Sequence, residues 1–327
     1  IRFFETKLRL NGGQFEGLPF NLAPSQAFKI GSLFGWKRAD GTRRFRRFYN
    51  EEGKGNGKSP LAAGIGLYMM TADGEAGSEI YAAAANKDQA MVLFRDSVKM
   101  VRQSPDLAKR LQFSGGMGRE YNIAYLATGS FFRPISKEQG STGSGPRPHC
   151  GLCDEVHEHP NRDAMEMLER GFKFRRQPLL AMFTNSGSDR KSVCWEEHEH
   201  AVRVAAGNPQ AKDDDATLLG EPVDDTTFCY VASLDVGDDP LTNPSCWIKT
   251  NPMLGVILQP DYLAGVVSQA LAMPGKANGI LRLHFCKWTE SATAWITRET
   301  LEPLLDDFDT DELGAVIGAG LDLSGTK

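Results

Sequence analysis

The stretch "FYNEEGKGNGKSPLAAGIGLYMM", residues 48–70, concentrates three glycines and a Lys-Ser pair within residues 53–59, directly before an apolar segment. A glycine-rich turn ahead of a helix indicates a loop that wraps a phosphate, because its backbone N–H groups can point at anionic oxygens. The phosphate-loop pattern is G-x-x-x-x-G-K-[ST], and Glu52 stands where its first glycine belongs. Residues 43–50 are predicted to form the preceding strand, and residues 59–72 the following helix.

The rest of the loop fits a nucleoside triphosphate and its magnesium ion. Lys58 would reach the β- and γ-phosphates, and the hydroxyl of Ser59 would ligate Mg²⁺. The alternative is a flexible glycine-rich turn, because "GNGKS" is a short pattern on its own. The residues of this loop that we predict to bind ATP are Gly53, Gly55, Asn56, Gly57, Lys58 and Ser59.

A second segment supplies the acids that such a loop needs. "HCGLCDEVH", residues 149–157, contains an apolar run that stops at Asp154 and Glu155. We predict that Asp154 binds the Mg²⁺ through its water and that Glu155 polarises the attacking water as general base. The alternative is an acidic pair favoured by a helix dipole. Together with the loop, the pair predicts a nucleoside triphosphatase that uses ATP and Mg²⁺.

The same segment also suggests a competing chemistry. Its histidines and cysteines have spacings that resemble those of zinc sites: His149, Cys150, Cys153, His157 and His159. We favour the interpretation that both cysteines are core residues of a buried strand, because the chain has no second C-x-x-C. "WEEHEH", residues 195–200, is predicted to form a solvated helix face.

Composition sets the broad class. The chain has 327 residues, 41% hydrophobic and 24% charged, which is typical of a globular protein with a sizeable core. A net charge of -5 argues against an overall attraction to nucleic acid, although local patches can still bind it. No apolar run is long enough to span a membrane. The six scattered cysteines predict reduced thiols and a cytosolic compartment.

Helix-like and strand-like segments alternate along the chain, which favours an α/β fold with mostly parallel strands. We therefore expect a three-layer α/β sandwich of the P-loop NTPase type, followed by a small helical subdomain within "QPDYLAGVVSQALAMPGKANGILRLHFCKWTES", residues 259–291. Residues 206–227 are polar and acidic and are predicted to form a solvated loop.

With both motifs placed, the chain resembles the large terminase subunit of tailed bacteriophages, the ATPase-nuclease that pumps DNA into capsids. The resemblance covers essentially the whole length. The family's upstream glutamine is similar to that in "FNLAPSQAF", which implies that Gln26 reads the adenine edge. The family tolerates a non-glycine at the first loop position and carries a basic residue inside the loop. Lys54 resembles that residue, and the resemblance implies a catalytic role for it beside Lys58 and Glu155.

The resemblance also implies a coupling motif and a domain division. "FTNSGS" is similar to the family's coupling motif, with Thr184, Asn185 and Ser186 beside the γ-phosphate. We expect an ATPase domain at 1–240, a helical linker at 241–312 and the first strand of an RNase H-like nuclease at 313–327.

Asp322 matches the first metal-binding aspartate of that nuclease. A single carboxylate cannot assemble a site for two divalent ions about 4 Å apart. We therefore expect the nuclease to be mostly absent and the chain not to cut DNA unless the natural protein continues past residue 327. Both ends are expected to be cut from a longer protein.

The predicted partners follow from the same resemblance: double-stranded DNA, a portal protein, a small terminase subunit and further copies of the chain in a ring, in the cytoplasm of an infected bacterium. Arg44 and Arg46 are candidates for DNA phosphate contacts, although we favour the alternative that they pair with nearby acids. Arg119 and Arg133 are candidates for an arginine given to the neighbouring subunit's site.

Two other functions compete with a packaging motor. A helicase-like or repair ATPase would use the same P-loop core, but it would continue into a second motor-like domain and not into a nuclease. A zinc-stabilised interaction module would bind metal and no nucleotide.

Overall fold

The computed structural model describes residues 1–135, 146–207 and 224–289. All of them belong to one compact unit, residues 1–292. Asp322 and the predicted nuclease strand lie outside the described residues.

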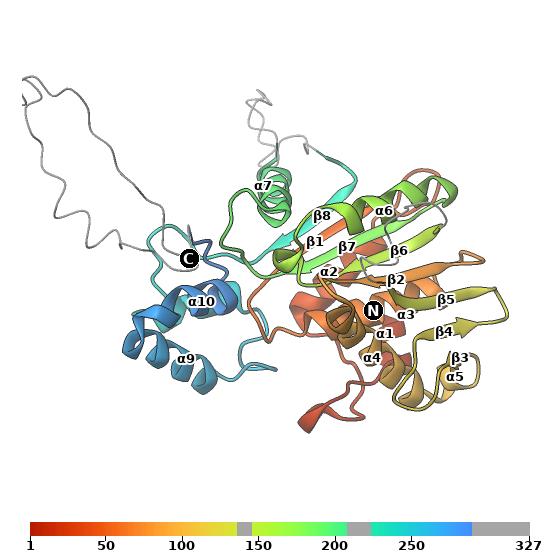
Figure 1. Ribbon diagram of the computed structural model, residues 1–327, viewed down its shortest axis with the longest axis horizontal. Helices are drawn as coiled ribbons and strands as arrows, with labels where there is room; N and C mark the ends of the chain where they lie inside the picture. Colours follow the sequence, from red (N-terminus) through yellow and green to blue (C-terminus); the bar gives the residue numbers. More distant parts are fainter. Residues whose placement is uncertain (136–145, 208–223, 290–327) are drawn as a thin grey trace, which may run out of the picture. The chain divides into compact units, whose positions relative to one another are not determined.

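A single eight-stranded sheet forms the centre of the described chain, in the order β3-β4-β5-β2-β6-β7-β1-β8 (Figure 1). Six strands, from β5 to β8 in that order, pair in parallel, and β3 and β4 add an antiparallel edge. The strands are β1 (Arg47–Glu51), β2 (Glu79–Ala83), β3 (Gln112–Ser114), β4 (Asn122–Tyr125), β5 (Ser130–Ile135), β6 (Pro148–Cys153), β7 (Leu179–Thr184) and β8 (Thr227–Val231).

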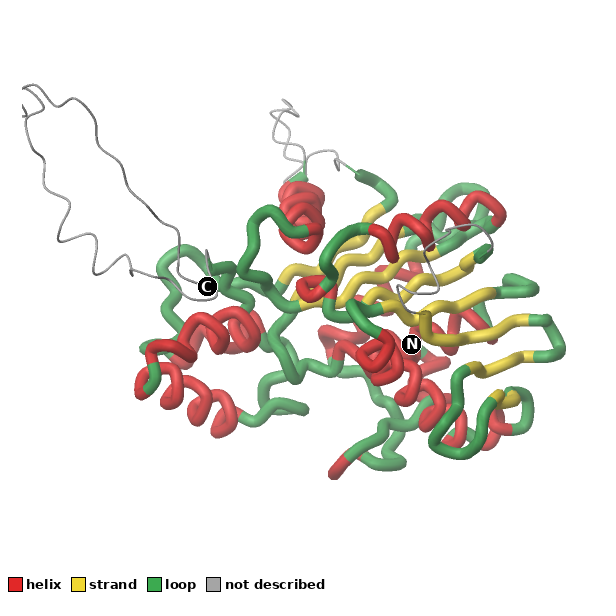
Figure 2. Tube along the Cα trace, viewed as in Figure 1, coloured by secondary structure: helices red, strands yellow, loops and turns green. Residues whose placement is uncertain are grey.

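Helices cover both faces of this sheet (Figure 2). One face packs on α1 (Arg2–Lys7), α2 (Pro24–Gly35), α3 (Lys58–Thr71) and α4 (Lys87–Gln103). The other face packs on α6 (Asp163–Gly171) and α7 (Val193–Ala206). The short α5 (Pro105–Ala108) follows α4. The predicted three-layer α/β sandwich with mostly parallel strands is confirmed.

The central elements form because their sequences suit burial on two sides. Strands β6 and β7 are buried at every residue, as expected for inner parallel strands covered on both faces. Helix α3 is apolar nearly all round and lies inside the core beneath the sheet. Helix α4 has one apolar stripe and begins where Asn86 accepts a hydrogen bond from the N–H of Gln89, at 3.0 Å.

The start of β1 differs from its prediction. The strand begins at Arg47, whereas residues 43–50 were expected to form it. Arg43 lies outside the ladder of β1: it forms an isolated bridge with Lys37, and its guanidinium donates to the carbonyl oxygens of Phe45 and Pro178. Its N–H donates to Gln177 at 3.0 Å, and its buried guanidinium lies 3.2 Å from Asp73.

A helical group follows β8 and has a core of its own. It comprises α8 (Trp247–Thr250), α9 (Pro260–Ala272) and α10 (Pro274–Phe285). Trp247, Leu263 and Phe285 are among its buried residues. The connection between β8 and α9 is therefore partly helical, because α8 lies within it. Among the described residues, no helix is both long and apolar enough to cross a membrane.

Candidate phosphate-binding site

The glycine-rich loop leaves the carboxyl end of β1 and enters α3 at Lys58. Gly57 caps the helix in the left-handed conformation, at φ 75°, which favours glycine. Across the described chain, the backbone N–H groups from Gly55 to Ser59 have no recorded acceptor. They form a cradle of free donors at a helix N-terminus, which is the environment that suits a phosphate.

Lys58 is held across the mouth of this cradle. Its Nζ donates to the carbonyl oxygens of Glu52 at 2.8 Å and Gly53 at 3.1 Å, and to Asn185 Oδ1 at 2.6 Å. The lysine therefore contacts both the phosphate loop and the residue that follows β7. Two of the residues singled out in the sequence, Lys58 and Asn185, are brought together here.

The hydroxyl of Ser59 donates to Asp154 Oδ2 at 3.0 Å. This contact joins the end of the loop to the acid that follows β6, as the assignment of both residues to one magnesium site requires. Burial raises the pKa of Asp154, while Lys58 and the bond from Ser59 act in the opposite direction. A buried carboxylate whose charge is poorly compensated is a good partner for a cation.

Glu155 follows in a backbone conformation that is uncommon for this residue type. Its φ of 48° and ψ of 52° lie in the left-handed region, which costs of order 1 kcal/mol or more outside glycine. Burial and the charge of Asp154 raise its pKa. Its Oε2 is buried and makes no hydrogen bond. An acid held in this way suits a general base.

The predicted coupling residues lie at the end of β7. Thr184 is fully buried and touches His157, whose N–H and Nδ1 lie 3.1 Å and 3.2 Å from Thr184 Oγ1. Ser186 donates to the carbonyl oxygen of Arg282 in α10 at 3.0 Å. The motif therefore contacts the loop lysine, the acidic segment and the helical group.

Glu52, which replaces the first glycine, points away from the cradle. Its carboxylate lies 2.8 Å from Lys29 Nζ in α2, and both side chains are fully buried. Asn50 donates to the same carboxylate at 3.0 Å. Burial lowers the pKa of Lys29, and the charge of Glu52 opposes this effect. The acid is therefore compatible with a triphosphate in the neighbouring loop.

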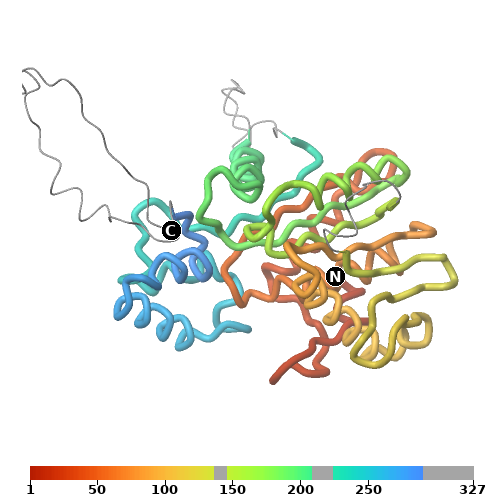
Figure 3. The backbone as a smooth tube through the Cα atoms, viewed as in Figure 1, coloured from red at the N-terminus to blue at the C-terminus, as the bar shows by residue number. Residues whose placement is uncertain are grey.

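The helical group covers the phosphate loop, which no sequence motif indicated. Figure 3 shows the blue residues of this group beside the orange segment after β1, although they are far apart in sequence. The N–H of Gly53 donates to Thr250 O at 2.9 Å, and Asn56 Nδ2 donates to Asn251 Oδ1 at 2.9 Å. A Cβ on Gly53 would stand 2.4 Å from Asn251 Oδ1, so only glycine fits there.

Gln26 lies in the first turn of α2 with its side chain buried. Its Oε1 accepts a hydrogen bond from the N–H of Ala23 at 3.2 Å. Its Nε2 is 3.4 Å from the place where a Cβ of Gly57 would stand. The glutamine is therefore beside the loop, while Lys54 is exposed on the loop itself.

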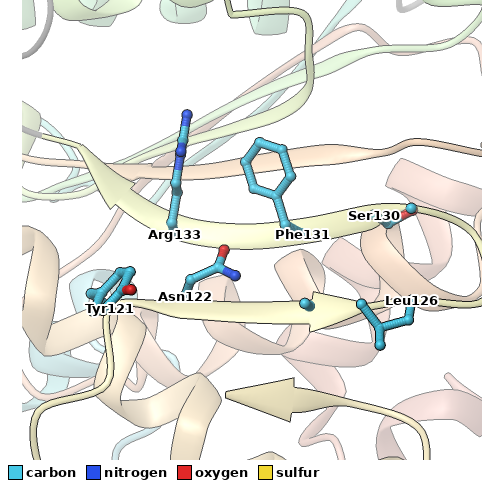
Figure 4. A pocket seen from close by; sticks show the side chains of 8 residues that line it. Tyr121, Asn122, Leu126, Ser130, Phe131 and Arg133 are labelled. Atoms are coloured by element: carbon cyan, nitrogen blue, oxygen red, sulfur yellow. The ribbon is translucent and has the colours of Figure 1, made fainter. Parts of the chain in front are cut away.

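The two arginines proposed for a neighbouring site are exposed and lie away from the cradle. Figure 4 shows Arg133 and Phe131 extending side by side from β5, and the guanidinium is 4.7 Å from the centre of the Phe131 ring. Arg119 lies in the connection between β3 and β4. No interaction between either arginine and residues 53–59 is recorded in the described chain.

The basic residues before β1 are largely paired. Arg44 forms an ion pair with Asp225, and its guanidinium lies 5.5 Å from the centre of the Trp36 ring. Arg46 donates to the carbonyl oxygen of Arg176 at 2.6 Å. These contacts support the alternative that the arginines stabilise the fold, without testing DNA binding.

The two cysteines of the proposed zinc pattern cannot share a metal ion. Both are buried in β6, but Cys150 faces the core beneath α3 and Cys153 the core beneath α6. His149 lies 2.8 Å from Asp73, and His159 lies 3.0 Å from the carbonyl oxygen of Asp154. All six cysteines of the chain are free thiols.

The prediction that residues 195–200 form a solvated helix face is wrong for two of them. Glu197 in α7 is only 5% exposed and forms ion pairs with Arg47 at 2.7 Å and Arg162 at 3.0 Å. His198 donates to Glu51 at 2.8 Å. The sequence pattern could not predict these contacts, because the basic partners of Glu197 and the acidic partner of His198 lie far away in the chain.

The donor set fits a magnesium ion. Mg²⁺ is usually held by one or two protein oxygens together with substrate phosphates and water, and not by a complete protein cage. Ser59 and Asp154 provide such oxygens beside the N–H cradle. Among the described residues, no group of three or more His, Cys, Asp or Glu side chains could hold a metal ion by itself.

Two family models match the chain. The ATPase domain of the terminase large subunit matches residues 24–203, and the endonuclease domain of the same family matches residues 221–327. The chain is 22% identical to the terminase large subunit of Enterobacteria phage HK97 over 261 residues, 76% of this chain and 45% of that protein. It is 26% identical to the protein YmfN of Escherichia coli K12 over 161 residues, 49% of this chain and 32% of that protein. The chain thus spans less than half the length of either curated relative.

Solved structures share the fold. The crystal structure of the HK97 bacteriophage large terminase superposes with a TM-score of 0.72 at 21% identity, over 88% of this chain and 54% of that one. The ATPase domain of the Thermus phage P74-26 large terminase gives 0.50 at 16% identity, over 82% of this chain and all of that one.

The endonuclease match corrects one prediction. The nuclease was expected to be mostly absent, but the endonuclease-domain match covers residues 221–327. That expectation depended on Asp322 as a single candidate metal ligand, which does not indicate how much of the domain precedes it. Strand β8 lies within the match and nevertheless pairs with β1.

Proposed function

The chain belongs to the terminase large subunit family, and on this premise we propose that it binds and hydrolyses ATP to move double-stranded DNA into a viral procapsid. The observation that carries the proposal is the hydrogen bond between Ser59 and Asp154 beside the free N–H groups of the loop. It joins a phosphate cradle to a metal-binding acid, and Glu155 follows directly.

Each residue has a defined part in this proposal. The N–H groups of residues 55–59 hold the phosphates, and Lys58 turns from its present carbonyl partners to the phosphate oxygens. Ser59 and Asp154 would hold Mg²⁺, which would supply positive charge beside the phosphates. Glu155 accepts the proton of the attacking water. Gln26 contacts the adenine, and Lys54 contacts the γ-phosphate.

Nucleotide binding and hydrolysis by the purified chain test this proposal. We expect Lys58→Ala to lower the rate of ATP hydrolysis by at least about 100-fold, because it removes a donor aimed at developing phosphate charge. The matched control is Lys276→Ala, which changes an exposed lysine of α10. Hydrolysis by Lys58→Ala at the parent rate would refute the assignment.

The family favours a packaging motor over a helicase, because an endonuclease match follows the ATPase match. We propose that the region after residue 221 supplies a metal-dependent nuclease in which Asp322 binds a divalent ion. The proposed partners are DNA, a portal protein, a small terminase subunit and further copies of the chain in a ring, in the cytoplasm of the infected bacterium. Within that ring, Arg119 or Arg133 would serve the neighbouring subunit's site.

Arg44 and Arg46 are proposed to contribute to DNA binding, because Arg44 stays partly exposed beside Asp225 and Arg46 donates to a neutral carbonyl oxygen. Charge reversal at both positions should weaken double-stranded DNA binding and reduce its salt dependence. Unchanged binding across a salt titration would assign these arginines to the fold alone.

A further inference from the structure

His157 lies between the proposed general base and the end of β7. It belongs to the short helical turn Val156–Glu158 that follows Glu155, and its side chain is 4% exposed. Burial lowers its pKa to about 4, so the imidazole is neutral near pH 7. A neutral, buried histidine must place its single N–H on a specific acceptor.

The hydrogen bonds around Thr184 assign that N–H. The hydroxyl of Thr184 donates to the carbonyl oxygen of Asn185 at 2.7 Å, so its oxygen is left to accept, also from the Cys194 thiol 3.4 Å away. It receives the backbone N–H of His157 at 3.1 Å and Nδ1 at 3.2 Å. This network places the proton of His157 on Nδ1.

The same Nδ1 lies close to a second acceptor. Glu155 Oε2 is 3.4 Å away but outside hydrogen-bond geometry, and this buried oxygen has no other partner. After a small rotation of the imidazole, Nδ1 would donate to Glu155 instead of to Thr184. An unpartnered buried carboxylate oxygen favours such an exchange, because leaving it unsatisfied is unfavourable.

The end of β7 contacts the loop lysine as well. Asn185, next to Thr184, accepts the 2.6 Å hydrogen bond from Lys58. One strand end therefore lies between the lysine that would hold the phosphates and the histidine beside the base. If Lys58 released Asn185, the resulting shift at the end of β7 would alter the position of Glu155 through the contacts of Thr184 and His157.

We propose that His157 is a positioning residue that links the carboxylate of Glu155 to Thr184 and so sets where this base points. The inference rests on the proposed ATPase function and names a residue beyond the loop and the acidic pair. His157 acts through Glu155 and touches neither nucleotide nor metal in this proposal.

The test compares side chains that keep or lose the N–H. His157→Phe keeps a ring without a donor, whereas His157→Asn places an amide N–H close to the position of Nδ1. We expect the Phe variant to lower kcat by about 10-fold to 100-fold, with the dissociation constant of a non-hydrolysable ATP analogue unchanged within about threefold. The Asn variant should recover most of the rate. His200→Asn is the matched control, because His200, a residue of α7, pairs with Asp224 and lies outside this network.

A second pair of variants tests the link to β7. Thr184→Ser keeps the acceptor and Thr184→Val removes it. If both residues act through one contact, the double variant of His157→Phe and Thr184→Val should lose no more rate than the more damaging single change. Fully multiplied losses would overturn the link.

The outcomes separate the two proposals. If Lys58→Ala and Glu155→Gln hydrolyse ATP at the parent rate, the ATPase assignment fails. If both lose activity but His157→Phe keeps kcat within twofold, only the role of His157 fails. A second result would also overturn that role. In it, His157→Asn does not recover the rate, and the unfolding midpoints of both His157 variants are lowered as well.

Discussion

Two pairs of adjacent acids stand at the same edge of the sheet, Glu51–Glu52 at the end of β1 and Asp154–Glu155 after β6. The first pair is buried among donors. Glu51 accepts from Tyr49 at 2.6 Å, His198 at 2.8 Å and Trp288 at 3.1 Å, and Glu52 is paired with Lys29.

The second pair has far fewer partners. Among side chains, Asp154 accepts only from Ser59 in the recorded contacts of the described chain, and one oxygen of Glu155 has no hydrogen bond. Burial raises the pKa of both acids. Two pairs of adjacent acids thus differ in their surroundings: the compensated pair stabilises the fold, and the uncompensated pair is available for a cation and a water molecule.

The largest expected difference between the pairs is in catalysis. Glu155→Gln should lower kcat by about 100-fold to 10,000-fold, because it removes the proton acceptor. Glu51→Gln should change kcat by less than about tenfold, since Glu51 faces Tyr49 and His198 and not the cradle. ATP turnover under saturating Mg²⁺ measures both, and equal losses would erase the distinction.

The next effect concerns stability and should follow the opposite order. Glu52→Ala leaves Lys29 buried without a counter-charge, which we expect to lower the free energy of unfolding by about 3 to 5 kcal/mol. Chemical denaturation measures this loss. The double change Lys29→Met with Glu52→Gln should recover most of it, because neither site then carries a charge. A small loss of unfolding free energy in Glu52→Ala alone would show that the Lys29–Glu52 ion pair is not needed for stability.

The smallest effect is a gain in stability that depends on pH. Because burial raises the pKa of Asp154 above its ordinary 3.8, the folded state holds this proton more tightly than the unfolded chain. The contribution of this group to stability is complete below pH 3.8 and is lost as the pH rises through the raised value. Asp154→Asn should therefore be more stable than the parent near pH 7, by about 0.5 to 2 kcal/mol.

Unfolding measured at several pH values checks this expectation. The advantage of Asp154→Asn should shrink towards zero below pH 3.8. An advantage that is constant with pH, or a loss near pH 7, would mean that the contacts with Ser59 and Lys58 outweigh burial.

Local patterns predicted a large part of the fold and of the candidate site. The strand-loop-helix around residues 53–59 and the apolar strand before Asp154 were both predicted, because each depends on residues close together in the sequence. The roles assigned to these site residues remain predictions, although Lys58, Ser59 and Asp154 do meet at one place.

Other features had no local signal. The cover of the loop by Asn251 joins residues 195 positions apart, and nothing in either segment indicates the other. The role proposed for His157 had a signal, since it lies two residues after Glu155, but the surrounding histidines and cysteines directed attention to zinc. Only the separation of Cys150 and Cys153 onto opposite faces removed that interpretation.

The sequence by itself determined that this protein has a phosphate loop before a buried helix and an acidic pair after a buried strand, because spacing and hydrophobicity act over a few residues. The tertiary structure decided which acids are neutralised. Glu52 turns to Lys29 and Glu155 remains unsatisfied beside His157, since partners for buried charges come from elements that meet only when the sheet is assembled.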